Sequence, residues 1–412
     1  MKNVCILLQN YYDDDIRVRR KAEALIGAGY HVDVIALRSD HSPAPSYQLN
    51  GANVYTLSLG KKRGSLFRYL FEYTAFFILA FRKLGQLMRE KPYDMVDVNN
   101  LPDFLVFAAA RAKRRGAKIV LDMHEITPEF YISKYGIAPD SWLVRLLTSI
   151  EQGSLRFAHH VLTINDPIQN LLLARGLSPN HSTVIMNSVD ETLFTSAIDR
   201  SPPITTITSS KPFVMMYHGT LTNLYGLDIA INAFEKAHEQ MPGSEFWILG
   251  RGPEQKDLER LARKLGLESE VKFCGLIPVD DIPQWLSRCD IGILATRRDI
   301  FLDLSFSNKL PEYIIMKKAV ICSRLKAIRY YFGEDALAYF DPMNVDDLAR
   351  QMVRLYGDAQ LRNTYADVAF QQYQPIRWEI MKKRYLEATA TLIADEVDAL
   401  NAEQSQAFAK VT

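Results

Sequence analysis

The sequence has few cysteines, almost no net charge and no long apolar run. Its four cysteines, Cys5, Cys274, Cys289 and Cys322, stand apart without CxxC spacing. This gives no zinc pattern and indicates small buried thiols in a reducing compartment. A net charge of +1 creates no positive field that would attract a polyanion, so we expect no nucleic-acid partner.

The sequence also shows no signal peptide, because its first residues lead directly into an apolar strand. Segment 60–83 is dense in Phe and Tyr and flanked by basic residues, yet its uncharged part, 73–81, is too short for a membrane span of about 20 residues. It predicts either a helix buried against a sheet or a surface helix that touches anionic lipid. We favour burial of the apolar stripe. We expect a cytoplasmic protein, with peripheral contact at the inner membrane face through 60–83 left open, to which the basic cluster at 61–63 would add attraction.

Short apolar runs alternate with amphipathic helices, which is typical of parallel α/β folds. Strands are expected in the first half at 4–8, 32–37, 54–57, 95–98, 119–123, 161–164 and 184–186, with a helix at 16–28. Strands are expected in the second half at 213–217, 246–249, 271–273, 291–294, 320–322 and 338–340. The pattern predicts two Rossmann-like doubly wound domains facing each other across a cleft. These are 1–190 and 211–374, joined by a polar linker at 191–210, with a helix at 375–400 that returns to the first domain.

Segment 306–323 combines a polar loop, a short helix, a turn and a buried strand. Ser307, Asn308 and Pro311 mark the helix start, where free backbone N–H groups and the helix dipole favour an anion. Glu312 follows about one turn later, close enough to accept hydrogen bonds from hydroxyls of the same ligand. The segment therefore fits either a site for a phosphate-bearing sugar compound or a capped surface helix.

Further polar residues follow other expected strands, at the edge where open α/β sheets bind ligands. The run Leu249-Gly-Arg-Gly-Pro-Glu254 has Gly250 and Gly252, which we expect to leave room for a ligand beside the backbone. It is not a GxGxxG motif, because Gln255 takes the last glycine position. In the first half, His124 stands between acidic neighbours in Asp122-Met-His-Glu125, a pattern that favours function over structure.

The order of these segments resembles the family 4 retaining glycosyltransferases over nearly the whole chain. The matching segments are Asp15-Ile-Arg-Val-Arg-Arg20, Asp122-Met-His-Glu125, Asn187-Ser-Val-Asp190, Tyr217-His-Gly-Thr220, Ile248-Leu-Gly-Arg-Gly-Pro253 and Asn308-Lys-Leu-Pro-Glu-Tyr313. The resemblance implies the GT-B fold, with the acceptor held mostly by the first domain and the nucleotide sugar mostly by the second. It also implies a reaction that needs no metal.

The resemblance assigns roles residue by residue. Glu312 would bind the ribose hydroxyls of the donor, and Ser307 and Asn308 the phosphates and the transferred sugar. His124 would contact the donor sugar near the reacting carbon. The remaining positions fall into a donor-binding group and an acceptor-side group. These are Gly219, Thr220, Gly250, Arg251, Gly252, Gly275 and Ile277 for the donor, and Asp15, Arg17 and Glu125 for the acceptor.

Two positions depart from the family. Leu304 replaces the first Glu of the family's paired-Glu motif, which removes a contact with the donor sugar. Thr220 and Tyr225 stand where an Arg and a Lys usually hold the diphosphate. A charge-assisted hydrogen bond contributes roughly 1.5–3 kcal/mol and a helix terminus only about 0.3–1 kcal/mol, so the helix alone does not compensate. Among the nearby cations, Lys309, Arg251, Arg297 and Arg298, we favour Lys309, and we expect the pair at 297–298 to be solvated.

The sequence thus predicts a retaining glycosyltransferase that uses a UDP- or GDP-linked sugar as co-substrate and no cofactor. Its acceptor would be a glycan or a lipid-linked saccharide of surface polysaccharide assembly. In this family the leaving phosphate is thought to take the acceptor proton, so no enzymic nucleophile is expected, and His124 and Lys309 are the candidate catalytic residues. Two alternatives remain: a nucleotide-sugar 2-epimerase on the same fold, and a non-catalytic protein that binds a glycan or a partner transferase.

Overall fold

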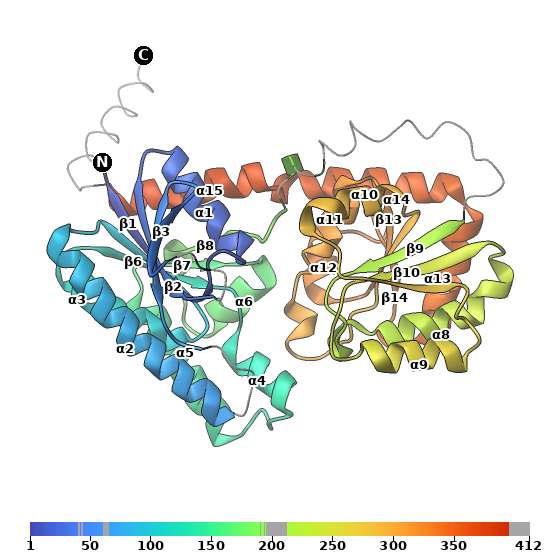
Figure 1. Ribbon diagram of the computed structural model, residues 1–412, viewed down its shortest axis with the longest axis horizontal. Helices are drawn as coiled ribbons and strands as arrows, with labels where there is room; N and C mark the ends of the chain where they lie inside the picture. Colours follow the sequence, from blue (N-terminus) through green and yellow to red (C-terminus); the bar gives the residue numbers. More distant parts are fainter. Residues whose placement is uncertain are drawn as a thin grey trace, which may run out of the picture. The chain divides into compact units, whose positions relative to one another are not determined.

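The computed structural model describes residues 1–39, 42, 44–60, 66–189, 191–192, 194 and 212–394, without the side chains of 66 and 67. It divides into two compact units (Figure 1): Met1–Asn187 with the residues from Glu379 on, and Ser188–Trp378. Nearly all of the expected linker, 191–210, and the basic cluster at 61–63 lie outside the described residues.

The first unit is built on an eight-stranded sheet in the order β3-β4-β2-β1-β5-β6-β7-β8. Its strands are parallel except for β3, which pairs antiparallel with β4 and was not expected from the sequence. The strand bounds are β1 Asn3–Tyr11, β2 His31–Leu37, β3 Ser46–Leu49, β4 Ala52–Leu57, β5 Met95–Asn99, β6 Lys118–Met123, β7 His160–Thr163 and β8 Ser182–Val184.

Most helices of the first unit contact this sheet, and the helix at Thr127–Tyr135 packs against the one at Trp142–Phe157. The helices are α1 Ile16–Gly27, α2 Leu66–Glu90, α3 Ala110–Arg114, α4 Thr127–Tyr135, α5 Trp142–Phe157, α6 Asp166–Ala174 and α15 Trp378–Ile393, with a 3₁₀ turn at Asp103–Ala109. The C-terminal helix α15 joins this unit through the buried Tyr385, whose hydroxyl donates a hydrogen bond of 3.0 Å to Asp97 Oδ2 on β5. None of these helices, nor any other among the described residues, is long and apolar enough to cross a membrane.

The second unit is built on a six-stranded parallel sheet in the order β11-β10-β9-β12-β13-β14. Its strands are β9 Phe213–His218, β10 Ser244–Leu249, β11 Val271–Gly275, β12 Ile291–Leu294, β13 Ala319–Ser323 and β14 Ala338–Phe340. Its helices are α8 Leu227–Ala237, α9 Gln255–Lys264, α10 Ile282–Ser287, α11 Lys309–Ile315, α12 Lys326–Tyr331, α13 Val345–Gly357 and α14 Ala359–Tyr373. Segment 306–323 forms the loop, short helix α11 and buried strand β13 that its sequence predicts.

Strand register brings the polar positions of each unit together. Leu8 on β1 pairs with Asn99 on β5, and Asn99 pairs with Asp122 on β6. In the second unit, Leu249 on β10 pairs with His218 on β9. Because parallel strands end at one edge of a sheet, the loops after these strands can share a ligand. Each unit therefore has one candidate binding edge.

Candidate active site

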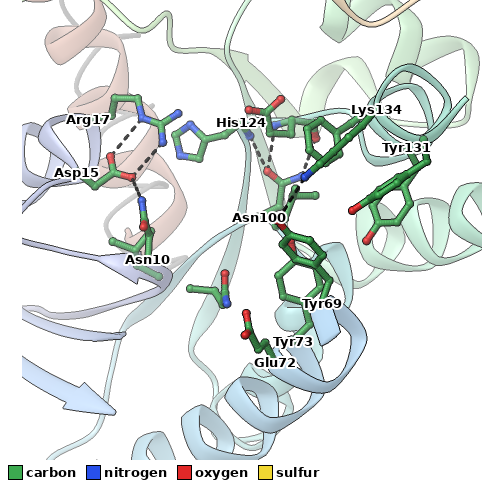
Figure 2. Close-up of a pocket in the computed structure, with 16 residues that line it drawn as sticks. Asn10, Asp15, Arg17, Tyr69, Glu72, Tyr73, Asn100, His124, Tyr131 and Lys134 are labelled. Carbon is green, nitrogen blue, oxygen red and sulfur yellow. Dashed lines mark hydrogen bonds and ion pairs between the residues drawn. The ribbon is translucent and has the colours of Figure 1, made fainter. Parts of the chain in front are cut away.

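A pocket of about 240 Å³ lies in the first unit, beside the ends of β1, β5 and β6 (Figure 2). Aromatic side chains of α2 and α4 form one wall, and polar side chains that follow the strands form the other. The lining residues are Leu8, Gln9, Asn10, Asp15, Arg17, Tyr69, Glu72, Tyr73, Asn100, Leu101, His124, Glu125, Phe130, Tyr131, Lys134 and Tyr135. The pocket thus contains all three residues expected on the acceptor side, together with His124.

Asp15 and Arg17 form an ion pair in this pocket. Arg17 donates hydrogen bonds of 3.2 and 3.0 Å to the two oxygens of Asp15, and Asn10 adds one of 3.1 Å. Burial raises the pKa of Asp15, but the charge and hydrogen bonds of Arg17 outweigh this and hold it well below its usual range. Asp15 also accepts from the Val18 amide as the N-cap of α1. Both oxygens of the Asp15 carboxylate therefore accept hydrogen bonds from the protein itself, which favours a role in positioning Arg17.

His124 follows β6 and is held in a single orientation. Its backbone N–H donates a 2.7 Å hydrogen bond to Asn100 Oδ1, and its Nε2 lies 2.9 Å from Asn99 Oδ1 and 3.0 Å from Asp122 Oδ2. Burial lowers the pKa of His124 well below its ordinary value, and the cations Arg17 and Lys21 act in the same direction. The ring is therefore neutral. Its Nδ1 is buried and has no hydrogen-bond partner among the described residues.

Glu125 is the second polar group of interest in the pocket. Its backbone is fixed by Asn100, which accepts from the Glu125 N–H at 3.2 Å and donates to its carbonyl at 2.7 Å. Burial raises the pKa of Glu125 to about 7, against the opposing effect of Arg17. A carboxyl group with this pKa can both accept and release a proton near neutral pH. Chemically, the pocket offers a neutral nitrogen, a titrating carboxyl group and aromatic faces, a combination suited to a sugar.

In the second unit, Lys309 lies across the loop that follows β9. Its ammonium group is 4.1 Å from the ring centroid of Tyr225 and 5.6 Å from that of Tyr217. A Cβ at Gly219 would lie 2.2 Å from Lys309 Cε, so a larger residue there would displace the lysine side chain. Burial lowers the pKa of Lys309 to about 8, against the attraction of Glu312. The structure therefore places a cation beside Tyr225, the position where the resemblance implies a lysine.

His218 was not predicted as a site residue, yet it holds Glu312. His218 Nε2 lies 2.5 Å from Glu312 Oε2, and its Nδ1 lies 3.0 Å from the Tyr313 hydroxyl. Tyr313 donates its only proton to the Met216 carbonyl at 2.8 Å, so Nδ1 must carry a proton and donate to Tyr313. No sequence signal connects these residues, which stand 94 positions apart.

The glycines after the strands serve a different purpose from the one expected. A Cβ at Gly250 would lie 1.9 Å from the Gly219 carbonyl oxygen, and one at Gly252 would lie 2.1 Å from that of Leu221. The Gly250 N–H donates a 2.6 Å hydrogen bond to the Gly275 carbonyl. Neighbouring backbone fills the space where a side chain would begin at Gly250 and Gly252. These glycines let three loops pack together.

The other predicted residues lie around these groups. Ser307 accepts hydrogen bonds from the Lys309 and Leu310 amides, so the first amides of α11 are not free for an anion as expected. Arg297 and Arg298 are not simply solvated, because they pair with Asp228 and Asp303. Thr220, Arg251 and Asn308 are exposed, whereas Ile277 is partly buried.

Two family patterns match the chain. Residues 15–188 match the family described as "Glycosyl transferase 4-like domain", and residues 212–358 match "Glycosyl transferases group 1". Both matched families are glycosyltransferases, and the two matches together span most of the chain. The family resemblance inferred from motif order is confirmed at this level.

Curated relatives are distant. The sulfoquinovosyl transferase of Arabidopsis thaliana is 23% identical over 309 residues, covering 72% of this chain and 56% of the relative. The phosphatidyl-myo-inositol mannosyltransferase of Mycolicibacterium smegmatis is 22% identical, covering 91% of this chain and 89% of the relative. The chain thus spans little more than half the length of the Arabidopsis relative and 89% of the mycobacterial one.

Solved structures show that the fold is GT-B, as the resemblance implied. Sucrose-phosphate synthase from Thermosynechococcus elongatus matches with a TM-score of 0.73 at 17% identity, covering 95% of this chain and 99% of that one. Anabaena HepE in complex with UDP matches with a TM-score of 0.68 at 18% identity, covering 95% of this chain and 100% of that one. At these identities the likeness concerns the fold.

Proposed function

We propose that the protein is a retaining, metal-independent glycosyltransferase that transfers a sugar from a UDP- or GDP-linked donor to a glycan or lipid-linked saccharide. Surface polysaccharide assembly is the process that we favour. The observation that carries the proposal is the position of Lys309, which supplies a cation beside Tyr225 where the sequence lacks the family's lysine. An ammonium group there can neutralise the diphosphate of a nucleotide sugar.

Charge development explains why this cation matters. As the glycosidic bond breaks, negative charge grows on the leaving diphosphate and positive charge on the sugar ring. A cation oriented before the reaction lowers that barrier, because it needs no reorganisation when the charge appears. Glu312, held by His218, would bind the ribose hydroxyls. The leaving phosphate would take the proton of the acceptor hydroxyl on the same face of the sugar, which preserves the anomeric configuration.

The pocket of the first unit would bind the acceptor sugar. Its aromatic wall provides flat apolar faces for a pyranose ring, while Arg17 and Glu125 provide a donor and an acceptor for its hydroxyls. His124 would contact the donor sugar, as the resemblance implies, through the unpartnered Nδ1. Leu304 offers no contact of this kind, so the donor sugar would be held with fewer polar groups than in the family.

A ligand screen tests the proposal without knowledge of the acceptor. The purified protein is mixed with UDP, GDP, ADP and their sugar conjugates, and thermal unfolding is followed, because a ligand of the native state raises apparent stability. We expect one nucleoside diphosphate to respond, with or without EDTA. Product formed from the nucleotide sugar alone would favour the epimerase. No response to any nucleotide would favour the non-catalytic alternative.

Membrane contact remains a proposal for the described part of segment 60–83. The buried stripe of α2, with Phe76 and Ala80, confirms the predicted packing of this helix. Its other face exposes Leu70 and Phe71, each 58% exposed, and Ile78. Flotation with vesicles of anionic lipid tests whether this face binds membrane, and Leu70→Ser with Phe71→Ser should then abolish binding. Equal recovery with neutral and anionic vesicles would contradict an electrostatic contribution.

A further inference from the structure

Arg251 is a cation that no other described residue neutralises. It lies in the loop between β10 and α9, and its side chain is exposed. Its guanidinium group forms no hydrogen bond or ion pair with a described residue, whereas those of Arg297 and Arg298 pair with acidic side chains. Exposure alone is ordinary for an arginine, so the position of Arg251 must decide whether it has a function.

The loop that carries Arg251 packs directly against the loop that follows β9. A Cβ at Gly250 would lie 1.9 Å from the Gly219 carbonyl oxygen. The Leu221 N–H donates a hydrogen bond of 3.1 Å to the Arg251 carbonyl, and this N–H belongs to the peptide group that joins Leu221 to Thr220. Because β9 and β10 are neighbouring parallel strands, both loops leave the same edge of the sheet. Arg251 is therefore a neighbour of Thr220 at the candidate binding edge of the second unit.

Lys309 approaches the same loop from α11. Its Cε would lie 2.2 Å from a Cβ at Gly219, so the lysine stem rests on the residue whose carbonyl faces Gly250. Its ammonium group lies over aromatic rings and, like the guanidinium group of Arg251, forms no ion pair within the described part of the chain. Two cationic residues from separate segments therefore contact residues 219–221, and no described acidic residue pairs with either.

We propose that Arg251 binds the diphosphate group of the nucleotide sugar together with Lys309. The proposal rests on the proposed function, which supplies the nucleotide sugar as the ligand. In a nucleotide sugar each of the two phosphates carries a negative charge at neutral pH, so a single ammonium group leaves one charge unbalanced. A guanidinium group suits this task, because it stays charged and its planar set of N–H donors matches the oxygens of a phosphate.

The two cations are held differently, which separates their effects on the reaction. Lys309 lies against the rings of Tyr217 and Tyr225, so its charge is oriented before negative charge develops on the leaving diphosphate. No contact with a described residue orients the Arg251 guanidinium group, so it binds the donor before the reaction as well as during it. Arg251→Gln should therefore raise KM for the nucleotide sugar and leave kcat unchanged within about twofold.

Calorimetry with UDP, GDP and their nucleosides, uridine and guanosine, tests the assignment on the full chain. Arg251→Gln should weaken the diphosphate that binds the wild type by about tenfold, the low end for a charge-assisted hydrogen bond because the side chain is exposed. The affinity for the matching nucleoside should change by less than about twofold, since it has no phosphate. Arg251→Lys, which keeps the charge, should retain most of the diphosphate affinity. Arg260→Gln, at an exposed arginine of α9, is the control and should leave both affinities unchanged.

A cation returned to the neighbouring residue provides a second test. Thr220→Arg added to Arg251→Gln should recover part of the diphosphate affinity. Equal losses for the nucleoside and the diphosphate in Arg251→Gln would overturn the proposal, and so would a loss in Arg298→Gln in place of Arg251→Gln. If the wild type binds a diphosphate and Arg251→Gln binds it equally well, the role of Arg251 is wrong and the proposed function stands. A wild type that binds no nucleotide would overturn both.

Discussion

Replacement of Lys309 by methionine separates the charge of this side chain from its packing. Methionine keeps an unbranched stem beside Gly219 but lacks the ammonium group. If that group contacts the diphosphate, its loss removes a charge-assisted hydrogen bond of roughly 1.5–3 kcal/mol. The affinity for the nucleoside diphosphate that responds in the screen should then fall about 10- to 150-fold, as measured by calorimetry. The affinity for the corresponding nucleoside, which has no phosphate, should change little.

The pH dependence of binding gives a second signature. The pKa of Lys309, about 8, means that the free protein carries this charge at pH 7 and loses it as the pH rises through 8. The diphosphate affinity of the wild type should therefore fall between pH 7 and pH 9.5, by up to tenfold per pH unit above 8. Lys309→Arg should bind with a flatter profile, because a guanidinium group stays charged over this range.

Lys309→Met should not destabilise the free protein, although it weakens diphosphate binding. Because burial lowers the pKa of Lys309, the charged form is disfavoured in the folded state relative to the unfolded chain. Lys309→Met should thus leave the melting temperature of the free protein unchanged or raise it at pH 7. Lys264→Met, at an exposed position on α9, serves as a control and should change neither binding nor stability.

A double variant tests whether the position of the cation in space matters more than the residue that supplies it. Tyr225→Lys added to Lys309→Met returns an ammonium group to the same region from the family's usual position, and should recover part of the lost affinity. The reasoning would be refuted if Lys309→Met left diphosphate affinity intact. Equal loss of nucleoside and diphosphate affinity, together with a lower melting temperature, would indicate a structural role instead.

Three further predictions concern single side chains. Since burial raises the pKa of Glu125 to about 7, its contribution to stability is most favourable below about pH 4.5 and is lost as the pH rises toward 7. Glu125→Gln should therefore raise the melting temperature more at pH 8 than at pH 5, and the same gain at both would refute this. Gly250→Ala should destabilise the protein by about 2 kcal/mol or more in chemical denaturation, because its Cβ meets the Gly219 carbonyl. Gly266→Ala, also at positive φ but with open space around it, should cost only about 1 kcal/mol. His218→Asn should weaken nucleoside binding about tenfold by releasing Glu312, measured by calorimetry, and unchanged nucleoside affinity would contradict this role.

Much of the fold could be predicted because buried strands appear in the sequence as short apolar runs. The strands expected at 291–294 and 338–340 have the bounds of β12 and β14. The expected strand bounds are wrong where buried apolar residues do not pair with a neighbouring strand. Val184, Ile185 and Met186 are all buried, yet only Val184 belongs to β8, and the Met186 amide instead donates to Met381 of α15. Strand β3 was missed because it is only four residues long and none of them is fully buried.

The sequence predicted single residues of the candidate site but not the contacts between them. Motif spacing located Glu312 and His124, because each follows a strand or opens a helix in a recognisable pattern. Their partners are distant in sequence: Glu312 contacts His218, and His124 contacts Asn99. Such pairs arise from strand register, which a single sequence does not reveal. The protonation of these residues, which decides their chemistry, therefore could not be inferred before the structure.

The position of Lys309 in space also weakens the non-catalytic alternative. The non-catalytic alternative depended on two departures from the family, Thr220 and Tyr225 in place of an arginine and a lysine, and Leu304 in place of a glutamate. Lys309 comes from another segment but reaches the Tyr225 side chain, so a position that lacks a cation in sequence does not lack one in space. The non-catalytic alternative then rests on Thr220, where the second cation is missing from the sequence, and on Leu304. A leucine there removes a contact with the donor sugar and none with the nucleotide, which weakens sugar discrimination before it weakens nucleotide binding.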